Sequence, residues 1–341
     1  MINRYGLNRN IGEEIKLQIR RNCSFSCVIC GSGFYHYEHI DPEFHDAQRH
    51  DPDRIACLCA NHHDQVTRGT MSKATVAKAY EIRKASVAAG ILTNPIGPLD
   101  LNCQWPSIQV ARLHYTEGLP CLLRYMGEDI IYFERGDQGE PAKIFADIYD
   151  SDGDLLFKIK GNEWIGPAHK YDFKTEGRLL KVWGKRRKVI LEMELEPPGK
   201  ISIKALDMRI GNAHILASDK IYLLGRRDVG GDWHWVHANL GIIRSSPCAA
   251  AFEFTSDQDL EWRDQHLGKN SQELRTSDGM CVINAFNGIL IKQLGIAIGA
   301  NTGSHQLAEL AIGKASVKDL RKMIRSHPDK VCEFISTGKI R

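Results

Sequence analysis

The feature that most constrains this chain is a pair of metal-ligand spacings near its N-terminus. Cys27-x-x-Cys30 lies in the segment CSFSCVIC, and Cys59-x-x-His62 repeats the spacing in LCANHH. Two ligands three residues apart can bind one Zn²⁺ from a tight turn, and two such pairs complete a closed tetrahedral set. Such an ion contributes on the order of 10 kcal/mol or more to the folding of a short segment. The spacing therefore predicts a structural zinc bound by Cys27, Cys30, Cys59 and His62.

Other cysteines near these pairs leave room for a different ligand set. Cys23 and Cys57 are close in sequence, and the simplest alternative is that all these thiols are buried small hydrophobic groups. Cys57 alternates with Cys59 along the expected strand IACLC, so one of them faces the metal and the other faces the core. Because Cys59 has His62 three residues on, we expect Cys59 to be the ligand.

Composition limits the class of protein. The chain has 341 residues, more than one typical domain, and 43% of them are hydrophobic, which is enough for a packed core. A formal net charge of +3 permits nucleic-acid binding without indicating it. The start, MINRYGLNRNIGEEIKLQIRR, contains no apolar export signal, and the longest apolar stretch, residues 281–300, is interrupted by polar residues. We therefore expect a reduced, cytoplasmic setting and no membrane partner. In such a setting, clustered cysteine and histidine indicate a metal site.

Changes in residue pattern divide the chain into five expected segments. Helical spacing follows Ser72, a suitable N-cap, and ends at Gly90, after which TNPIGPLD has the composition of a linker. The segments are a polar lead-in at 1–22, a metal-binding module with its trailing helix at 23–93, a linker at 94–104, a β-rich domain at 105–250 and a mixed, mostly helical region at 251–341.

The β-rich segment consists of short runs in which apolar and polar residues alternate, such as KIFADIY and KVILEMELE. Turn residues separate the runs, for example Asp-Gly at 152–153 and Gly-Asn at 211–212. This pattern favours a sandwich, a barrel or a stacked β-coil. The architecture as a whole is therefore expected to be α+β, with a zinc-bound N-terminal module.

The last segment carries more helical signals. Ser316 opens a capping-box arrangement for a short helix through Ile324, with Pro328 just past its end. The stretch after Cys281 is expected to be a buried helix, with strand as the alternative.

Three side chains near the zinc ligands carry the groups that hydrolytic chemistry needs. Glu38 and His39 end an aromatic, strand-like run, and His63 follows the expected ligand His62 at the start of a short helix. Because zinc ties these elements together, we expect the three side chains to converge. A carboxylate and an imidazole can bind a hard divalent cation such as Mg²⁺ or Mn²⁺, and a neutral imidazole can take a proton from water. The alternative is that Glu38-His39 caps a turn and His63 lies on the surface.

Taken together, CxxC, YEHIDP and LCANHHDQVTRG resemble the HNH endonuclease family over residues 23–69. The resemblance implies a ββα-metal fold beside a structural zinc held by the four ligands named above. It also implies that His39 is the general base and that Glu38 and His63 bind the catalytic divalent metal.

One position departs from the family pattern. The middle letter of the name HNH stands for an Asn, and the corresponding position in this chain lies near Asp53. We expect Asp53 to orient the loop that carries His39 through a backbone hydrogen bond. Asp46 is a second candidate for orienting His39, although it lies with His45 and His50 in a segment whose composition favours a solvated loop.

A compact nuclease module has little surface for choosing a target, so the β-rich domain is the expected source of specificity. Its basic run KVWGKRRK, residues 181–188, mixes cations with Trp183, which suits phosphate contacts and stacking. The alternative is a solvated strand edge that discourages strand pairing. A modified base or a small molecule is the expected ligand of this domain.

The sequence therefore favours a metal-dependent endonuclease that cuts double-stranded DNA, with restriction or phage defence as the expected setting and a homodimer for cutting both strands. One alternative is a non-catalytic zinc knuckle that binds nucleic acid or protein. The other is a nuclease that acts on RNA. Retention of Glu38, His39 and His63 together favours catalysis, since a binding-only module has no need of all three.

Overall fold

The computed structural model describes residues 2–89, 93–95, 105–116, 118–136, 142–167, 170–197, 199–228, 230–238, 242–243, 250–255, 273–275, 281–285, 288–291, 296–299 and 310–337. The chain divides into two compact units, which are unit 1 (Met1–Leu99 and Leu156–Lys188) and unit 2 (Asp100–Leu155 and Val189–Arg341). This division differs from the expected one, because residues 156–188 group with the N-terminal module rather than with the β-rich middle.

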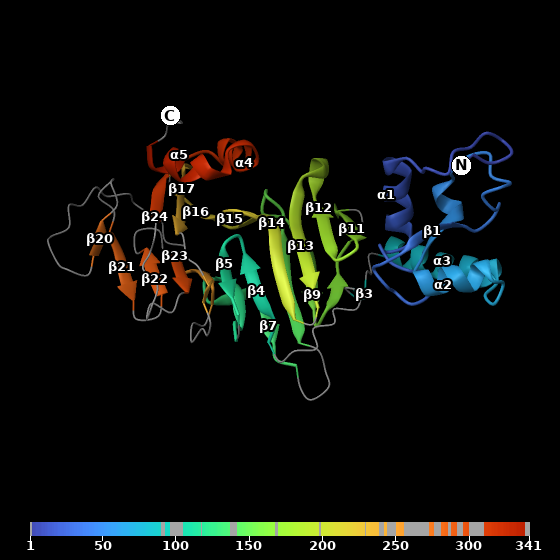
Figure 1. The fold of residues 1–341 in the computed structure, drawn as a ribbon, viewed down its shortest axis with the longest axis horizontal. Helices are drawn as coiled ribbons and strands as arrows, with labels where there is room; N and C mark the ends of the chain where they lie inside the picture. The colour runs from blue at the N-terminus through green and yellow to red at the C-terminus, as the bar shows by residue number, and fades with distance from the viewer. Residues whose placement is uncertain are drawn as a thin grey trace. The chain divides into compact units, whose positions relative to one another are not determined.

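Unit 1 combines three helices with short antiparallel strand pairs (Figure 1). Its helices are α1 (Glu13–Asn22), α2 (Ala60–Thr67) and α3 (Lys73–Ala88), with 3₁₀ turns η1 (Pro52–Arg54) and η3 (Lys185–Arg187). Its strands are β1 (His36–His39), β2 (Ile55–Leu58), β3 (Thr93–Pro95), β9 (Leu155–Lys160), β10 (Glu163–Ile165), β11 (Asp172–Glu176) and β12 (Leu179–Trp183). The expected linker thus begins inside β3, which pairs with β10, and residues 96–104 lie outside the described residues.

Helix α1 replaces the expected polar lead-in. Gly12 precedes it in an extended conformation, acidic residues occupy its first turn and basic residues its last turn, which complements the helix dipole. Ile15 and Ile19 lie one turn apart, and Ile19 is fully buried in the core of unit 1. The helix therefore packs against the Cys/His segment as part of its core.

The helix expected after Ser72 is confirmed. The Ser72 hydroxyl accepts a hydrogen bond from the Thr75 backbone N–H, and α3 runs from Lys73 to Ala88. Its buried face, with Val76 and Tyr80, packs on the same core as Ile19. Gly90, the expected stop, lies outside the described residues.

The hairpin of β11 and β12 is held to the N-terminal part of unit 1 by an ion pair and aromatic contacts. Arg20 of α1 donates from Nε and Nη2 to the two carboxylate oxygens of Asp172, at 2.9 and 2.6 Å, and both side chains are buried. The rings of Phe25 and Tyr171 stack with centroids 5.2 Å apart. The hairpin is therefore a built-in part of unit 1.

Unit 2 is dominated by strands. One sheet has the order β20 (Glu273–Arg275), β21 (Cys281–Ala285), β22 (Gly288–Ile291), β23 (Ile296–Gly299), β19 (Phe252–Phe254), β6 (Cys121–Tyr125), β7 (Glu128–Glu134) and β8 (Lys143–Tyr149). The other has the order β13 (Val189–Glu196), β14 (Lys200–Ile210), β15 (Ala213–Ser218), β16 (Tyr222–Arg227), β17 (Trp233–Ala238) and β24 (Leu310–Lys314), with β4 (Ser107–Val110), β5 (Leu113–Tyr115) and β18 (Ile242–Ile243) beside it.

Alternation and turn chemistry explain this β-rich architecture. In β8 every second residue is buried, and Gly211, between β14 and β15, has a positive φ of 54°. The two sheets contact each other through Tyr222 and Phe252, whose ring centroids are 5.0 Å apart. Among the described strands the sheet orders are open paths, so two packed sheets fit better than a closed barrel.

The expectation of a mostly helical C-terminal region is wrong. The stretch after Cys281, expected to be a helix, forms the strands β21, β22 and β23. The three strands are only four or five residues long, the stretch is rich in isoleucine, and it contains an Asn-Gly step at 287–288, which favours hairpins.

Among the described residues of this region, only those at its end are helical. Helices α4 (Val317–Ser326) and α5 (Val331–Thr337) follow β24, with the 3₁₀ turn η5 (Pro328–Lys330) between them. The Ser316 hydroxyl accepts from the Asp319 backbone N–H, so the expected cap is confirmed. No helix in the part of the chain that the structure describes combines the length and apolar character of a membrane span.

Candidate functional site

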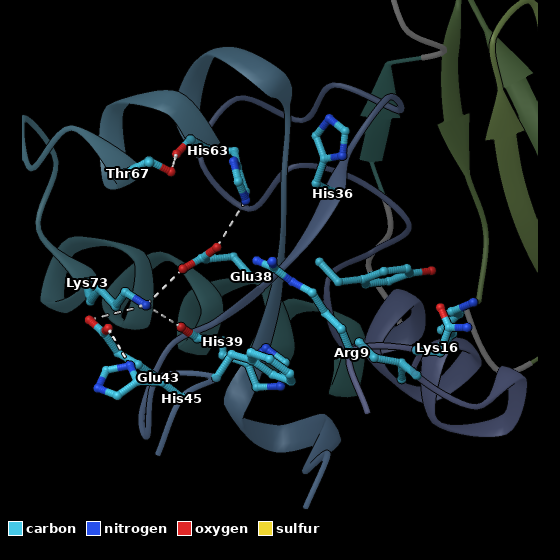
Figure 2. A pocket seen from close by; sticks show the side chains of 14 residues that line it. Arg9, Lys16, His36, Glu38, His39, Glu43, His45, His63, Thr67 and Lys73 are labelled. Carbon is cyan, nitrogen blue, oxygen red and sulfur yellow. Dashed lines mark hydrogen bonds and ion pairs between the residues drawn. The ribbon is translucent and has the colours of Figure 1, made fainter. Parts of the chain in front are cut away.

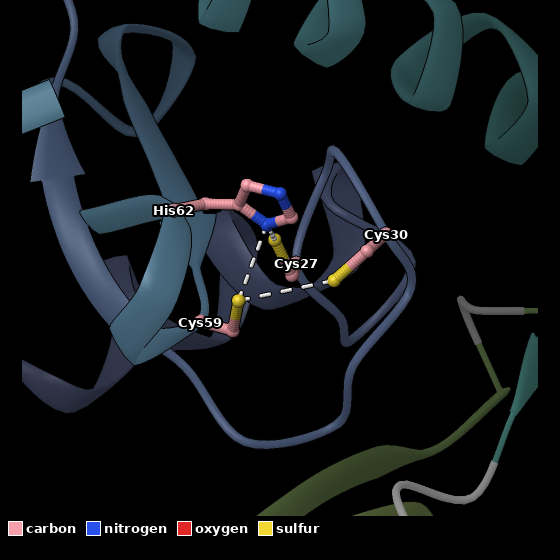
Figure 3. A group of neighbouring side chains, drawn as sticks. All are labelled: Cys27, Cys30, Cys59 and His62. Carbon is pink, nitrogen blue, oxygen red and sulfur yellow. Dashed lines mark hydrogen bonds between the residues drawn. The ribbon is translucent and has the colours of Figure 1, made fainter. Parts of the chain in front are cut away.

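Four metal-ligand side chains converge where the turn after α1 meets the start of α2 (Figure 3). The ligand atoms of Cys27, Cys30, Cys59 and His62 all lie within 4.8 Å of one another. His62 Nδ1 lies 3.2 Å from Cys59 Sγ and 3.4 Å from Cys27 Sγ. Cys30 Sγ lies 3.8 Å from Cys59 Sγ.

These distances test whether the donors fit zinc. In a tetrahedral site with Zn–S bonds near 2.3 Å and Zn–N bonds near 2.0 Å, two sulfurs lie about 3.8 Å apart and a sulfur and a nitrogen about 3.5 Å apart. The three separations agree with those values to within a few tenths of an ångström. The cluster is therefore consistent with a closed structural zinc site in which His62 binds through Nδ1.

Local backbone geometry brings the two ligand pairs together. The first pair sits on a turn in which Gly31 N–H donates to the Cys27 carbonyl and Gly31 adopts a positive φ of 77°. The second pair sits on the first turn of α2, where Cys59 is the residue before the helix. Cys57 is fully buried in the core, so the alternation expected for Cys57 and Cys59 is confirmed.

Glu38 of β1 and His63 of α2 form a close pair (Figure 2). Strand β1 pairs antiparallel with β2, and Glu38 stands opposite Ala56. His63 Nε2 lies 3.1 Å from Glu38 Oε2. Two ligand atoms in adjacent positions of an octahedral ion with bonds near 2.1 Å lie about 3 Å apart. The pair therefore fits neighbouring positions around one hard divalent cation.

Lys73, the first residue of α3, holds the other oxygen of Glu38. Its Nζ lies 2.8 Å from Glu38 Oε1 and donates at 2.7 Å to the backbone carbonyl of His39. Glu43 Oε1 is 3.6 Å from the same nitrogen. Lys73 thus positions both residues at the end of β1, and it turns Glu38 Oε2 toward His63.

A chain of hydrogen bonds sets the orientation of His39. His39 Nε2 lies 3.2 Å from His50 Nδ1, and His50 Nε2 lies 2.8 Å from the backbone carbonyl oxygen of Asn8. A carbonyl only accepts, so neutral His50 carries its proton on Nε2 and its Nδ1 accepts from His39 Nε2. Neutral His39 then keeps its lone pair on Nδ1.

The surroundings of His39 also determine its charge. The pKa of His39 is lowered to about 4, mainly because the ring is buried and also because His50 lies nearby, while Glu38 acts in the opposite direction. At pH 7 the imidazole is therefore neutral, which is the form that accepts a proton.

Glu38, His39 and His63 line one pocket of about 700 Å³. The cations Arg9, Lys16 and Lys73 line the same pocket, and so do His36, Glu43, His45 and Thr67 (Figure 2). A cleft with several positive side chains raises the local concentration of anions such as phosphodiesters. The pocket thus combines an acid–imidazole pair, a neutral imidazole and several cationic side chains.

The structure does not bring Asp53 to His39. Asp53 Oδ1 accepts from the Asn22 side chain at 3.0 Å and from Lys84 Nζ at 2.9 Å, which places this carboxylate beside α1 and α3. The expected orienting role is therefore not supported by any contact of the described residues. His50 and Lys73 make the contacts to His39 instead.

Sequence reasoning missed several residues of this pocket. His50 was expected in a solvated loop, and Lys73, Arg9 and Lys16 were assigned no function. His50 lies eleven positions from His39, so only the closure of the loop between β1 and η1 brings the rings together. Lys73 is the first residue of α3, directly after the cap Ser72, and no local pattern links it to β1. Asp46, the other orienting candidate, pairs with His45 at 2.9 Å.

Comparison with family models, with curated proteins and with solved structures finds no match for this chain. The function of the pocket therefore has to be argued from its residues.

Proposed function

We propose that this chain is a metal-dependent nuclease of the HNH type that hydrolyses phosphodiester bonds in double-stranded DNA. The observation that carries the proposal is the 3.1 Å approach of Glu38 Oε2 and His63 Nε2 in a pocket that also contains His39. The neighbouring Cys₃His cluster supports it, because a structural zinc there fixes the start of α2 and with it His63.

Glu38 and His63 would bind the catalytic divalent ion, Mg²⁺ or Mn²⁺. When bound, such an ion stabilises negative charge on the phosphate and on the leaving oxygen. Two protein ligands leave room for water and substrate oxygens, as is usual for Mg²⁺ at phosphate sites. Lys73 holds Glu38 Oε1, so that Oε2 remains directed to this position.

His39 is the proposed general base. Its Nδ1 lone pair takes a proton from the attacking water, while Nε2–H stays bonded to His50. Because the Asn8 carbonyl fixes the proton of His50 on Nε2, the His39 ring cannot exchange the roles of its two nitrogens without breaking this chain. Arg9 and Lys16 bind phosphate oxygens at the rim of the pocket.

Plasmid cleavage tests the proposal. Supercoiled DNA is incubated with the full chain in Mg²⁺, Mn²⁺ or EDTA, and wild type is compared with His39→Ala. We expect metal-dependent nicking or cutting that falls at least a hundredfold in the variant while its zinc content stays unchanged. His45→Ala is the matched control, because this exposed histidine lines the pocket but pairs with Glu43 and Asp46.

The outcomes also separate the alternatives. Cleavage that survives in His39→Ala contradicts the proposed base. Zinc-loaded protein that binds DNA or a protein partner but never cleaves is a non-catalytic zinc knuckle, and faster cleavage of RNA makes RNA the substrate. In this proposal unit 2 selects the target, through a modified base or a small-molecule signal, as expected of a restriction or phage-defence nuclease, and a homodimer cuts both strands.

A further inference from the structure

The strands β11 and β12 separate an apolar face from a charged face. In their antiparallel register Phe173 stands opposite Val182, and both side chains are buried. Lys174 stands opposite Lys181, and Trp183 lies on the same face as Lys181, two residues along the strand. The other face of the hairpin therefore carries two opposed lysines and an indole, with the buried Asp172 opposite Trp183.

The positive charge continues past the end of β12. Lys185, Arg187 and Lys188, in and after η3, are exposed. Lys181 Nζ lies 5.8 Å from the centre of the Trp183 ring, which places a cation beside a partly exposed aromatic side chain. Exposed Lys and Arg side chains that neutralise phosphates supply the sequence-independent part of DNA binding.

Protection of a sheet edge does not explain this pattern. Charged residues on an edge strand discourage pairing with other chains, and β11 is an edge strand. Most of the cations, however, lie on β12 and on or just after η3 and not on the edge strand β11. Two acidic residues share this face, namely Asp172, which binds Arg20, and Glu176, which forms an ion pair with Lys174.

This face has a fixed position relative to the pocket. Arg20 of α1 binds Asp172 of β11, and the Thr175 hydroxyl donates to the backbone carbonyl of Gly33. The same helix α1 contributes Lys16 to the pocket. Glu13, on the first turn of α1, forms an ion pair with Lys16 and also interacts electrostatically with Lys174. Lys16 of the pocket and Lys174 of the hairpin thus lie near the same turn of α1.

We propose that Lys174, Lys181, Trp183, Lys185, Arg187 and Lys188 form a docking surface for the sugar–phosphate backbone of duplex DNA. The inference rests on the proposed function, because the duplex that docks here is the one whose scissile phosphate enters the pocket. The surface belongs to unit 1, so the nuclease unit has its own binding surface for DNA, which does not depend on the base sequence. Selection of the target is left to unit 2.

Salt-dependent binding tests the surface. The parent is full-length His39→Ala, which binds without cutting, and the probe is a fluorescent 20-base-pair duplex of arbitrary sequence measured by anisotropy from about 50 to 200 mM salt. In the hairpin variant Lys181→Gln, Lys185→Gln and Arg187→Gln are combined. We expect the slope of log K against log salt to fall by about 0.9 for each lost contact, close to 3 in total, and Kd to rise at least tenfold at 100 mM.

A matched variant removes the same charge from unit 2, at the exposed residues Lys220, Lys318 and Lys322, and is expected to bind like the parent. Unchanged zinc content verifies that the hairpin variant is folded. If the hairpin variant has the same slope and Kd as the parent, or if the matched variant loses as much affinity as the hairpin variant, the proposed surface is wrong. Tighter binding of an RNA duplex of the same sequence overturns the commitment to DNA.

The proposed function and this surface can fail separately. If the wild-type chain never cleaves but the hairpin variant loses DNA binding, the surface stands and the nuclease assignment falls. If the wild-type chain cleaves and the hairpin substitutions change neither binding nor cleavage, the nuclease stands and the surface falls.

Discussion

Replacing Arg20 by Met tests how unit 1 is held together. The guanidinium makes two charge-assisted hydrogen bonds to Asp172, at 2.9 and 2.6 Å, and the side chains are only 1% and 8% exposed. Arg20 Nη1 also lies 3.0 Å from the Tyr37 hydroxyl. Removing one partner of a buried pair leaves an uncompensated charge and costs about 3–5 kcal/mol. For a unit of this size that corresponds to a loss of roughly 10–20 °C in Tm.

A double-mutant cycle turns this magnitude into a measurement. Scanning calorimetry on zinc-loaded protein compares Arg20→Met, Asp172→Leu and the combination of both. We expect the double variant to be more stable than either single variant, because it buries no unpaired charge. A Tm within about 2 °C of wild type for Arg20→Met, or strictly additive single effects, would refute the claim that this pair fixes the β11–β12 hairpin to α1.

Three further predictions address the metal, the base and unit 2. Cys30→Ser is expected to lose its zinc and much of its Tm, and full zinc content measured by atomic absorption would count against Cys30 as a ligand. His50→Ala is expected to lower kcat about 10–100-fold with little change in KM, and His50→Gln, whose carbonyl oxygen can accept from His39, is expected to recover part of it. Burial lowers the pKa of His214 below its usual 6.5, despite its hydrogen bond to Asp207. The unfolded chain therefore binds this proton first, and unit 2 should lose stability as the pH falls below about 6.5, whereas in His214→Gln the thermal unfolding curve should depend less on pH in that range.

Local spacing was enough to predict the metal-binding part of the site. The two pairs of ligands lie three residues apart within each pair, so a turn and the first turn of a helix suffice to present them. Glu38 and His63 follow from the same frame, since each lies close in sequence to one of the two Cys/His ligand pairs. The sequence alone therefore predicted that these two side chains lie close together, and their nearest atoms are 3.1 Å apart.

What could not be predicted depends on distant packing. Arg20 and Asp172 are separated by 152 positions, and no periodicity links α1 to β11. The role of His50 depends on the carbonyl of Asn8, which lies 42 positions away. The helix expected after Cys281 was wrong for a local reason, because short isoleucine-rich runs fit a helix and a strand equally well until strand partners are known.

The most direct test of the proposed catalytic site is a crystal structure of the full chain soaked in Mn²⁺, with anomalous data collected at the manganese and zinc edges. Two separate metals are predicted, namely zinc within the Cys₃His cluster and manganese bound by Glu38 Oε2 and His63 Nε2, with His39 beside it. Manganese found elsewhere on the chain, or Glu38 still paired with His63 at saturating Mn²⁺, would contradict the account.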